Sequence, residues 1–276
     1  MRESSEFSVD REEGVTVYHR RDFSPGQIKE AVEKHEAIAQ ERPSDLLKHS
    51  PESIVSRVEA GGERICVKQF RCPEWTDRLK GLFRVSKGLR AWMAGNGLKV
   101  RAIPSLKVMA CAERRKGFAV RESFLLMEAS EEGAEMDRYL LKGFPDFERR
   151  RLFIKVFARW LSRLHQKGVY HRDMKTCNIV VSEGKEGWQF RLLDLEDVRL
   201  DHKVDENDLF DNLLQLNTSI PRSMTAADRL RFYREYSRLY PVVEDERGFL
   251  SKLIRKSRER GIVYVSPRGV VEEKWG

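Results

Sequence analysis

Large apolar residues recur at helical spacing in the second half of the chain. Between residues 146 and 167 the members of this series are Phe153, Val156, Phe157, Trp160, Leu161 and Leu164. The spacing places them on one side of a helix, so we expect them to form core. Gly168 follows and is typical of a helix end. Similar spacing predicts further helices over residues 25–40, 204–216, 226–240 and 245–259.

Short apolar runs between turn residues predict strands in the first half. Residues 54–58 and 65–70 are joined by a glycine turn and follow a shorter apolar piece, which together predict a three-stranded meander. Further strands are expected at residues 108–110, 123–127 and 15–18. Strands followed by helices predict an α+β chain, with a small, mainly antiparallel β-sheet first and a mainly helical part second.

Residues 74–101 combine helical spacing with strong positive charge. The basic residues are Arg78, Lys80, Arg84, Lys87, Arg90, Lys99 and Arg101. No acid lies between Asp77 and Glu113 to neutralise them. The stretch is either a solvated helix face or a surface for an anionic substrate or membrane. The second interpretation predicts weak, salt-sensitive binding to anionic vesicles that charge reversal at Arg84, Lys87 and Arg90 reduces.

Composition indicates a globular protein with an anionic partner. The 276 residues are 40% hydrophobic and 35% charged, with a net charge of +8. This charge favours a nucleotide, a phosphorylated saccharide, a lipid headgroup or a nucleic acid as partner. Four cysteines without C-x-x-C spacing favour reduced thiols over disulfides or zinc. No apolar run approaches a membrane span and no signal-peptide core is present, so we expect a cytoplasmic protein that can also lie on a membrane surface.

The stretch from residue 169 to residue 199 carries the strongest chemical signal. It reads V-Y-H-R-D-M-K-T-C-N-I-V-V, a turn, and then F-R-L-L-D-L-E-D-V-R. Asp173 and Asn178 stand five apart, and Asp194 follows sixteen residues later. This spacing is similar to that of the catalytic loop and the metal-binding acid of phosphoryl-transfer enzymes. The alternative is a solvated loop followed by an ordinary hairpin.

The residue types in this stretch suit phosphoryl transfer. Asp173 can accept the proton of an acceptor hydroxyl or orient that hydroxyl. Lys175 can neutralise charge on the phosphoryl group that moves. Asn178 and Asp194 offer oxygen ligands to a Mg²⁺ ion that bridges the phosphates of ATP. We therefore predict ATP and Mg²⁺ as cofactors, with Asp173 and Lys175 as catalytic residues.

The first half offers candidate phosphate contacts. Lys68 lies late on the predicted strand 65–70, where a kinase holds the lysine that contacts the α- and β-phosphates. Taken alone, a lysine that alternates with apolar residues on a strand is more often solvent-facing. The first turn of the meander lacks G-x-G-x-x-G, so Ser50, Ser53 and nearby backbone amides are expected to cover the phosphates instead.

A hinge is expected where the apolar strand 123–127 ends. Backbone groups of Glu128, Ala129 and Ser130 are predicted to meet adenine there. The chain then divides into an N-terminal extension with a helix (1–43), a first lobe (44–128) and a second lobe (129–276) of one kinase-like domain.

Taken in order, these motifs resemble the lipopolysaccharide kinase (Kdo/WaaP) family from about Ser44 to Tyr240. The similar pieces are S-I-V-S-R-V-E…I-C-V-K-Q-F, S-K-G-L-R-A-W…A-I-P-S, S-F-L-L-M-E-A, H-R-D-M-K-T-C-N-I, L-L-D-L-E-D-V-R-L and L-N-T-S-I-P-R-S-M-T-A-A-D-R-L-R-F. Many kinases share the catalytic pieces. A-I-P-S and L-N-T-S-I-P…D-R-L-R-F are more particular to this family.

The resemblance implies a two-lobed protein-kinase-like fold and ATP-dependent phosphorylation of a Kdo or heptose hydroxyl in the inner core of lipopolysaccharide. It implies a lipid-linked core saccharide as partner, peripheral contact with the anionic cytoplasmic face of the inner membrane, and no nucleic acid. Which sugar accepts the phosphate and the oligomeric state do not follow from the motifs.

Two alternatives to this sugar kinase differ in their sequence requirements. A protein kinase is disfavoured because no A-P-E follows and because the basic helix lacks the usual glutamate. A catalytically weak kinase-like binding protein is disfavoured because a scaffold would not need Lys68, Asp173, Asn178 and Asp194 together.

Overall fold

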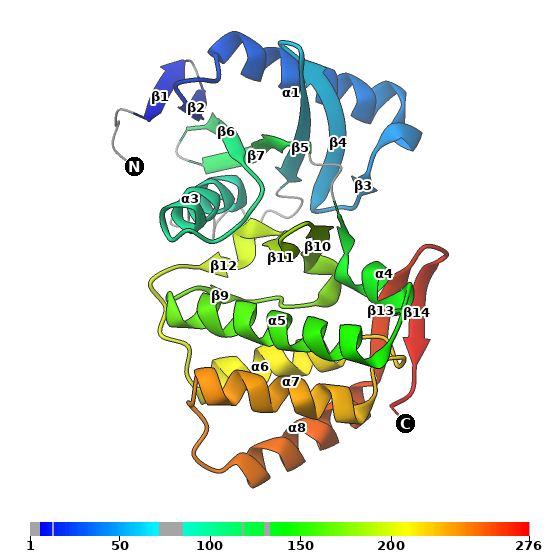
Figure 1. Cartoon of the computed structure of the whole chain (residues 1–276). Helices are drawn as coiled ribbons and strands as arrows, with labels where there is room; N and C mark the ends of the chain where they lie inside the picture. The colour runs from blue at the N-terminus through cyan, green and yellow to red at the C-terminus, as the bar shows by residue number, and fades with distance from the viewer. Residues whose placement is uncertain (1–5, 13, 72–84, 118, 130–132, 276) are drawn as a thin grey trace. The chain divides into compact units, whose positions relative to one another are not determined.

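The chain folds into two compact units. The computed structural model describes residues 6–12, 14–71, 85–117, 119–129 and 133–275 (Figure 1). The first unit comprises Met1–Gly97 and Leu106–Glu131, and the second comprises Leu98–Ser105 and Glu132–Gly276. The short segment Leu98–Ser105 therefore belongs to the second unit, although residues on both sides of it belong to the first.

A seven-stranded antiparallel sheet forms the centre of the first unit. In spatial order the strands are β1 (Phe7–Glu12), β2 (Val15–Arg20), β6 (Val108–Lys116), β7 (Ala119–Glu128), β5 (Glu63–Arg71), β4 (Ser53–Ala60) and β3 (Lys48–His49). Neighbouring strands are antiparallel throughout. The predicted antiparallel sheet is thus confirmed. The meander (β3, β4, β5) and the strands β6 and β7 account for five of its strands, and β1 and β2 add two more.

Those two strands come from the N-terminal segment. We expected residues 1–43 to form an extension ahead of the first lobe, but β1 and β2 are built into the sheet beside β6. The predicted helix follows as α1 (Pro25–Glu41). Its start is fixed by Ser24, whose hydroxyl accepts from the Gln27 N–H, and by Pro25 in the first turn.

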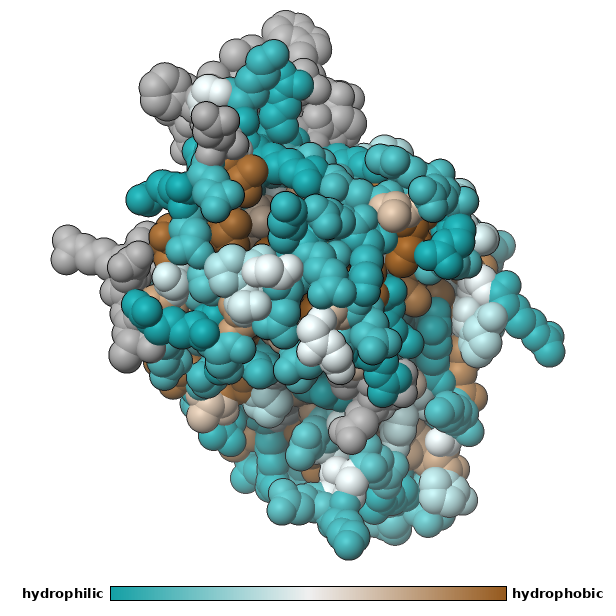
Figure 2. Space-filling model, turned by 90° about the horizontal axis from the view of Figure 1, so that it is seen from above, coloured by the Kyte–Doolittle hydropathy of each residue, from teal (hydrophilic) through white to brown (hydrophobic). Residues whose placement is uncertain are grey.

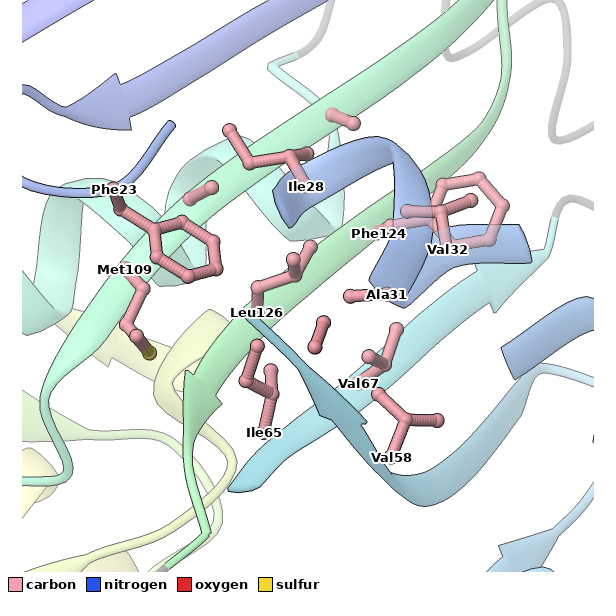
Figure 3. Packing of buried hydrophobic residues seen from close by; sticks show 13 residues of the cluster. Phe23, Ile28, Ala31, Val32, Val58, Ile65, Val67, Met109, Phe124 and Leu126 are labelled. Atoms are coloured by element: carbon pink, nitrogen blue, oxygen red, sulfur yellow. The ribbon is translucent and has the colours of Figure 1, made fainter. Parts of the chain in front are cut away.

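Helix α1 covers one face of this sheet. Ile28, Ala31 and Val32 point from α1 toward Val67 and Leu126 of the central strands (Figure 3). Because strand residues alternate between faces, the neighbours of Val67 and Leu126 along each strand point away from α1. The core therefore lies between α1 and the sheet, and Lys68 is directed to the opposite face.

Helix α3 (Lys87–Val100) begins against the sheet in the first unit. The Gly88 N–H donates to Ser123 Oγ of β7 at 3.2 Å, and a Cβ at Gly88 would lie 2.7 Å from that oxygen, so this close approach requires glycine. The predicted basic helix is confirmed for residues 87–100, while Arg78, Lys80 and Arg84 lie outside the described residues. Lys87 forms an ion pair with Glu52 at 2.6 Å.

The second unit is mainly helical, as predicted. Its helices are α4 (Met136–Leu141), α5 (Phe147–Gln166), α6 (Glu206–Asn217), α7 (Ala226–Leu239) and α8 (Glu246–Arg260). The strands are β8 (Ala134–Glu135), β9 (Tyr170–His171), β10 (Ile179–Gly184), β11 (Gly187–Leu192), β12 (Val198–Arg199), β13 (Ile262–Ser266) and β14 (Gly269–Glu273). The aromatic side of α5 is core, because Phe153 and Phe157 are buried and both contact Phe190 of β11.

Hydrophilic residues dominate the face of the molecule seen from above (Figure 2). Its described atoms are mainly hydrophilic, and hydrophobic side chains appear there as small separate spots (Figure 2). Within the described ranges, none of the helices combines the length and the apolar composition needed to cross a membrane.

His165 on α5 should make stability depend on pH. It is buried and its Nδ1 lies 2.6 Å from the Tyr236 hydroxyl of α7, and burial lowers its pKa to about 4. Between pH 6.5 and 4 the unfolded chain binds more protons than the folded one, so stability falls as the pH falls through this window. We expect a loss of about 2 kcal/mol between pH 7 and pH 5 from this residue.

Urea unfolding at both pH values measures this effect. Between pH 7 and pH 5 the unfolding free energy of His165→Gln should fall by about 2 kcal/mol less than that of the wild type. This difference does not depend on the stability of the variant at pH 7. An NMR signal of His165 that titrates near pH 6.5 in the folded protein would contradict the assignment.

Candidate active site

The sequence H-R-D-M-K-T-C-N forms a loop in the second unit. It leaves β9, which pairs with β12, and ends in the 3-10 turn η2 (Thr176–Asn178) before β10. The hairpin of β10 and β11 then carries the chain to Asp194, which precedes the 3-10 turn η3 (Leu195–Asp197). Pairing of β9 with β12 brings the two ends of the predicted catalytic stretch side by side.

His171 fixes the start of this loop from the interior. The ring is fully buried, with Nε2 3.0 Å from the Leu193 carbonyl and Nδ1 3.1 Å from the Asp173 amide nitrogen. A carbonyl only accepts and an amide N–H only donates, so these bonds require the neutral ring with its proton on Nε2. The imidazole thereby ties the backbone of Asp173 to the residue before Asp194.

Three predicted site residues meet directly in the loop. Asn178 Nδ2 donates to Asp173 Oδ2 at 3.1 Å and to the Asp173 carbonyl at 2.8 Å. The other carboxylate oxygen of Asp173 lies 2.8 Å from Lys175 Nζ. The carboxylate is therefore held in one orientation, while both Asp173 and Lys175 stay partly exposed and within reach of a substrate.

Asp194 lies beside this group with a left-handed backbone. Its φ is 48° and its ψ is 53°, a conformation that costs a residue with a side chain about 1–2 kcal/mol. The Leu193 N–H donates to the Asn178 carbonyl at 2.9 Å, which holds the chain next to Asn178. Backbone strain of this kind concentrates at functional sites, so the conformation supports a role for the Asp194 carboxylate.

Arg172 connects the loop to the segment after Asp194. Its Nη2 lies 2.6 Å from Asp197 Oδ1, and its backbone N–H donates to the Asp197 carbonyl at 3.0 Å. The motifs leave open whether Glu196 or Asp197 assists a metal. In the structure one oxygen of the Asp197 carboxylate is engaged by Arg172, the residue before Asp173.

Gln215 of α6 holds the loop on both sides of Asp173, a contribution that the motifs did not reveal. Its Nε2 donates to the Arg172 carbonyl at 2.7 Å, and its Oε1 accepts from the Met174 N–H at 2.6 Å. One side chain therefore satisfies the backbone groups immediately before and after the candidate base.

Two neighbours of Gln215 extend this support. Asn212 Nδ2 donates to the His171 carbonyl at 2.9 Å, and Ser219 Oγ accepts from the Thr176 N–H at 3.0 Å. Polar residues at 212, 215 and 219 stand three and four apart; the first two lie on α6, whose other buried side chains are leucine, and Ser219 follows its C-terminal end. That interruption of an apolar helix stripe was the available sequence signal.

Replacing Gln215 should slow turnover without weakening nucleotide binding. Gln215→Leu removes both hydrogen bonds at similar size, so we expect kcat to fall by about tenfold to a hundredfold with little change in KM for ATP. Gln166→Leu is the control, since it also removes one glutamine bond to a backbone carbonyl, that of Leu239, outside the loop. Equal kcat values for the two variants would rule out a positioning role.

Lys68 lies on β5 of the first unit with a buried side chain. It is 5% exposed, and its Nζ lies 5.0 Å from the centre of the Phe70 ring. The solvent-facing alternative is therefore wrong. Taking an ammonium group out of water costs several kcal/mol, so lysines are rarely buried unless they have a specific role.

Ser50 and Ser53 close the turn between β3 and β4. The Ser53 N–H donates to Ser50 Oγ at 3.1 Å, and that hydroxyl donates to the Ser53 carbonyl at 3.0 Å. Their side chains therefore shape the turn first of all. The following strand places Val55 opposite Lys68 in register, so the turn and the lysine belong to adjacent strands.

The predicted adenine contacts are partly engaged within the protein. The Glu128 N–H donates to the Lys107 carbonyl at 2.9 Å, and the Ala129 N–H donates to the Arg64 carbonyl at 3.2 Å. Ser130 lies outside the described residues. The backbone amides of these two residues are therefore used within the protein.

Other chemistry at the loop is disfavoured. Burial raises the pKa of Cys177 to about 11, so its thiol stays protonated near neutral pH and is a poor nucleophile. Among the described residues, no three His, Cys, Asp or Glu side chains gather into a metal site. Asn178 and Asp194, which the motifs predict as metal ligands, lie at the two ends of the β10–β11 hairpin beside this loop.

A family profile matches residues 77–236, and its description is lipopolysaccharide kinase (Kdo/WaaP) family. The match spans more than half of the chain and includes Asp173, Lys175, Asn178 and Asp194. The chain belongs to the lipopolysaccharide kinase (Kdo/WaaP) family. Lys68, Ser50 and Ser53 precede the matched residues.

Two curated members of the family are similar over most of their length. The lipopolysaccharide core heptose(I) kinase WaaP of Pseudomonas aeruginosa is 24% identical over 217 residues, which cover 74% of this chain and 81% of that protein. The enzyme of the same name from Escherichia coli is 24% identical over 223 residues, which cover 75% of this chain and 84% of that protein.

A solved structure confirms the fold of this family member. WaaP in complex with acyl carrier protein matches with a TM-score of 0.63 at 22% identity, covering 87% of this chain and 95% of that one. The predicted kinase-like α+β fold and the resemblance read from the motifs are thus both confirmed. Family membership also confirms the predicted class of activity, a kinase that acts on lipopolysaccharide.

Proposed function

We propose that this kinase transfers the γ-phosphoryl group of ATP to a sugar hydroxyl of the lipopolysaccharide inner core. The observation that carries the proposal is the group of Asp173, Lys175 and Asn178, held in direct contact beside Asp194. The acceptor is a heptose or a Kdo residue. The names of the two curated relatives favour heptose.

The residues present fit Mg²⁺. Asn178 Nδ2 is committed to Asp173, which sets the orientation of the amide and directs Oδ1 elsewhere. That oxygen meets the Cys177 thiol at 3.8 Å, a weak contact that a ligand can replace. An amide oxygen and the Asp194 carboxylate are the hard donors that Mg²⁺ prefers, and nucleotide phosphates and water complete such sites.

Asp173 and Lys175 have different roles at the acceptor hydroxyl. When bound, ATP and Mg²⁺ supply the phosphoryl group and neutralise charge on the phosphates. Asp173 orients the acceptor hydroxyl and takes its proton as the bond to phosphorus forms. Lys175 lies 2.8 Å from Asp173 and places its positive charge where the phosphoryl oxygens pass.

The first unit supplies the remaining nucleotide contacts in this proposal. Lys68 binds the α- and β-phosphates, which its place late on β5 supports because kinases hold their phosphate-binding lysine on a strand of the first lobe. The turn with Ser50 and Ser53 covers the phosphates mainly through backbone amides. Backbone groups of Glu128 and Ala129 meet adenine.

A phosphoryl-transfer assay with purified protein tests the function. With radiolabelled ATP and Mg²⁺, label should enter lipopolysaccharide whose inner-core heptose lacks phosphate, and enter fully phosphorylated lipopolysaccharide or a general protein substrate far more slowly. The Asp173→Asn variant is the matched control. Preferential labelling of protein would favour a protein kinase, and no transfer to any acceptor would favour a binding protein.

The same proposal places the enzyme at the cytoplasmic face of the inner membrane. Its lipid-linked core saccharide is carried there, and a net charge of +8 favours contact with anionic headgroups. Nucleic acid has no role in this reaction.

A further inference from the structure

Helices α5 and α7 lie side by side in the second unit (Figure 1). Seven of their ten lysine and arginine side chains are here named the α5–α7 basic face: Arg151, Lys155, Arg159, Arg163, Arg231, Arg234 and Arg238. A groove of about 640 Å³ runs between the helices, and five of the seven line it. The face is thus a continuous surface and not a set of scattered charges.

Acidic side chains neutralise only part of this face. The ion pairs are Arg151–Glu148, Arg159–Glu235, Arg238–Glu235 and Arg231–Asp228. Glu235 is thereby shared between two arginines. Lys155, Arg163 and Arg234 have no acid partner in the part of the chain that the structure describes. Positive charge therefore exceeds negative charge on the face.

The arrangement on α5 does not serve the helix itself. Arg151, Lys155, Arg159 and Arg163 follow one another at intervals of four residues, which makes them neighbours on the helix surface. Like charges at this spacing repel and weaken a helix. A stripe with this cost favours a role in binding an anionic partner.

Apolar side chains are exposed on the same surface. Phe147 and Leu152 of α5 are each 48% exposed, and Leu230 of α7 is 37% exposed. The guanidinium groups of Arg151 and Arg231 lie 5.6 and 5.3 Å from the centre of the Phe147 ring. The face thus combines bases with accessible aromatic and aliphatic groups, which is typical of helices that lie in a membrane interface.

We propose that the α5–α7 basic face docks this kinase on an anionic lipid bilayer. Headgroup phosphates lie against Lys155, Arg163 and Arg234, and Phe147, Leu152 and Leu230 enter the interface. The inference rests on the proposed function in one respect, because a lipid-linked acceptor gives the enzyme a reason to dock on a membrane. The charge and exposure of the face stand independently of that function.

A bilayer fits the face better than an acidic protein does. The three exposed apolar residues are spread along two helices among the bases, whereas a specific protein partner needs an apolar centre ringed by polar groups. Long basic side chains can lay their stems over apolar surface while their charges stay at the headgroups. A flat anionic surface meets both conditions along the whole face.

Vesicle sedimentation of the full chain without ATP tests the proposal. Vesicles of phosphatidylethanolamine with about one third phosphatidylglycerol should bind the wild type, and phosphatidylcholine vesicles should not. The triple variant Lys155→Gln, Arg163→Gln, Arg234→Gln should bind about a hundredfold more weakly, since each base contributes about fivefold near an anionic surface. These three residues have no described acid partner, so their replacement should leave the fold intact.

A matched variant on α8 controls for net charge. Arg247→Gln, Arg258→Gln, Arg260→Gln removes the same charge from exposed positions elsewhere on the second unit and should keep most of the binding. The double variant Leu152→Ser, Leu230→Ser should also weaken vesicle binding, and the size of this loss should not depend on salt concentration.

Three results would overturn the proposal. Equal losses in the two triple variants would mean that net charge alone decides binding. Absence of wild-type binding would also reject it. The third such result is a wild type that binds polyglutamate through Lys155, Arg163 and Arg234 but does not bind vesicles. The face would then bind an acidic protein. The vesicles contain no lipopolysaccharide, so none of these results bears on the proposed reaction.

Discussion

Asp173→Ala should lower kcat by about three orders of magnitude and leave ATP binding largely intact, because the base acts in the transition state. Alanine also removes the acceptor of the Asn178 amide and the partner of Lys175. Asp173→Asn separates these effects, since it keeps a side-chain oxygen for Asn178 but cannot take a proton. We expect a similar loss of kcat for both variants.

The measurements are initial rates over ATP and acceptor concentrations, with nucleotide affinity determined in parallel. Asp211→Asn provides the control, since Asp211 is an exposed aspartate of α6 outside the loop. If Asp173→Asn keeps activity within about tenfold of the wild type, Asp173 is not the base. If ATP affinity falls as much as kcat, the residue serves binding instead of transfer.

The loop with the sequence H-R-D-M-K-T-C-N was predictable because its determinants are local. H-R-D-x-K-x-x-N joins residues that are at most seven positions apart, so their contacts follow from the loop once β9 and β10 form. Helices α5 to α8 were predictable for a similar reason, since their apolar stripes and caps lie within each helix. In these places sequence neighbours are also neighbours in space.

Features that depend on distant partners could not be predicted in the same way. The burial of Lys68 depends on what covers its face of the sheet, and strand alternation alone left it solvent-facing. The place of β2 beside β6 joins residues almost a hundred positions apart. Gln215 reaches the loop from 41 positions away in the chain, and no motif links it to Met174.

The C-terminal hairpin illustrates the same limit. β13 and β14 were not predicted, although the uninterrupted apolar run I-V-Y-V of β13 lies between Gly261 and a Pro-Arg-Gly turn and offered a strand signal. In the structure the Val265 N–H donates to the buried Asp137 carboxylate of α4 at 2.9 Å. The anchor of this hairpin lies 128 positions earlier, so its place beside α4 has no signature in the local sequence.

Asp194→Asn should weaken binding of Mg²⁺-ATP much more than binding of adenosine. A carboxylate that coordinates Mg²⁺ contributes to ATP binding because the metal also binds the phosphates. Adenosine has no phosphates, so its binding does not depend on this carboxylate. We expect a loss of about tenfold to a hundredfold in Mg²⁺-ATP affinity and a larger loss of kcat/KM, since metal charge also stabilises the transition state.

Asparagine is the informative replacement because of the backbone at this position. Residue 194 has a φ of 48°, and asparagine tolerates this left-handed conformation about as well as aspartate does. Asp194→Ala would add backbone strain to the loss of the ligand, so it could not separate the two. Asp201→Asn is the matched control, since Asp201 also has a positive φ of 55° and lies outside the loop.

Calorimetric titration of both ligands, with and without Mg²⁺, decides the assignment. For the wild type, Mg²⁺ should raise ATP affinity and leave adenosine affinity unchanged, and Asp194→Asn should remove most of that Mg²⁺ dependence. Equal losses of affinity for ATP and adenosine would mean that Asp194 stabilises the fold and does not bind the metal. An unchanged Mg²⁺ response would leave Asn178 without its proposed partner, and the metal would have to be held elsewhere.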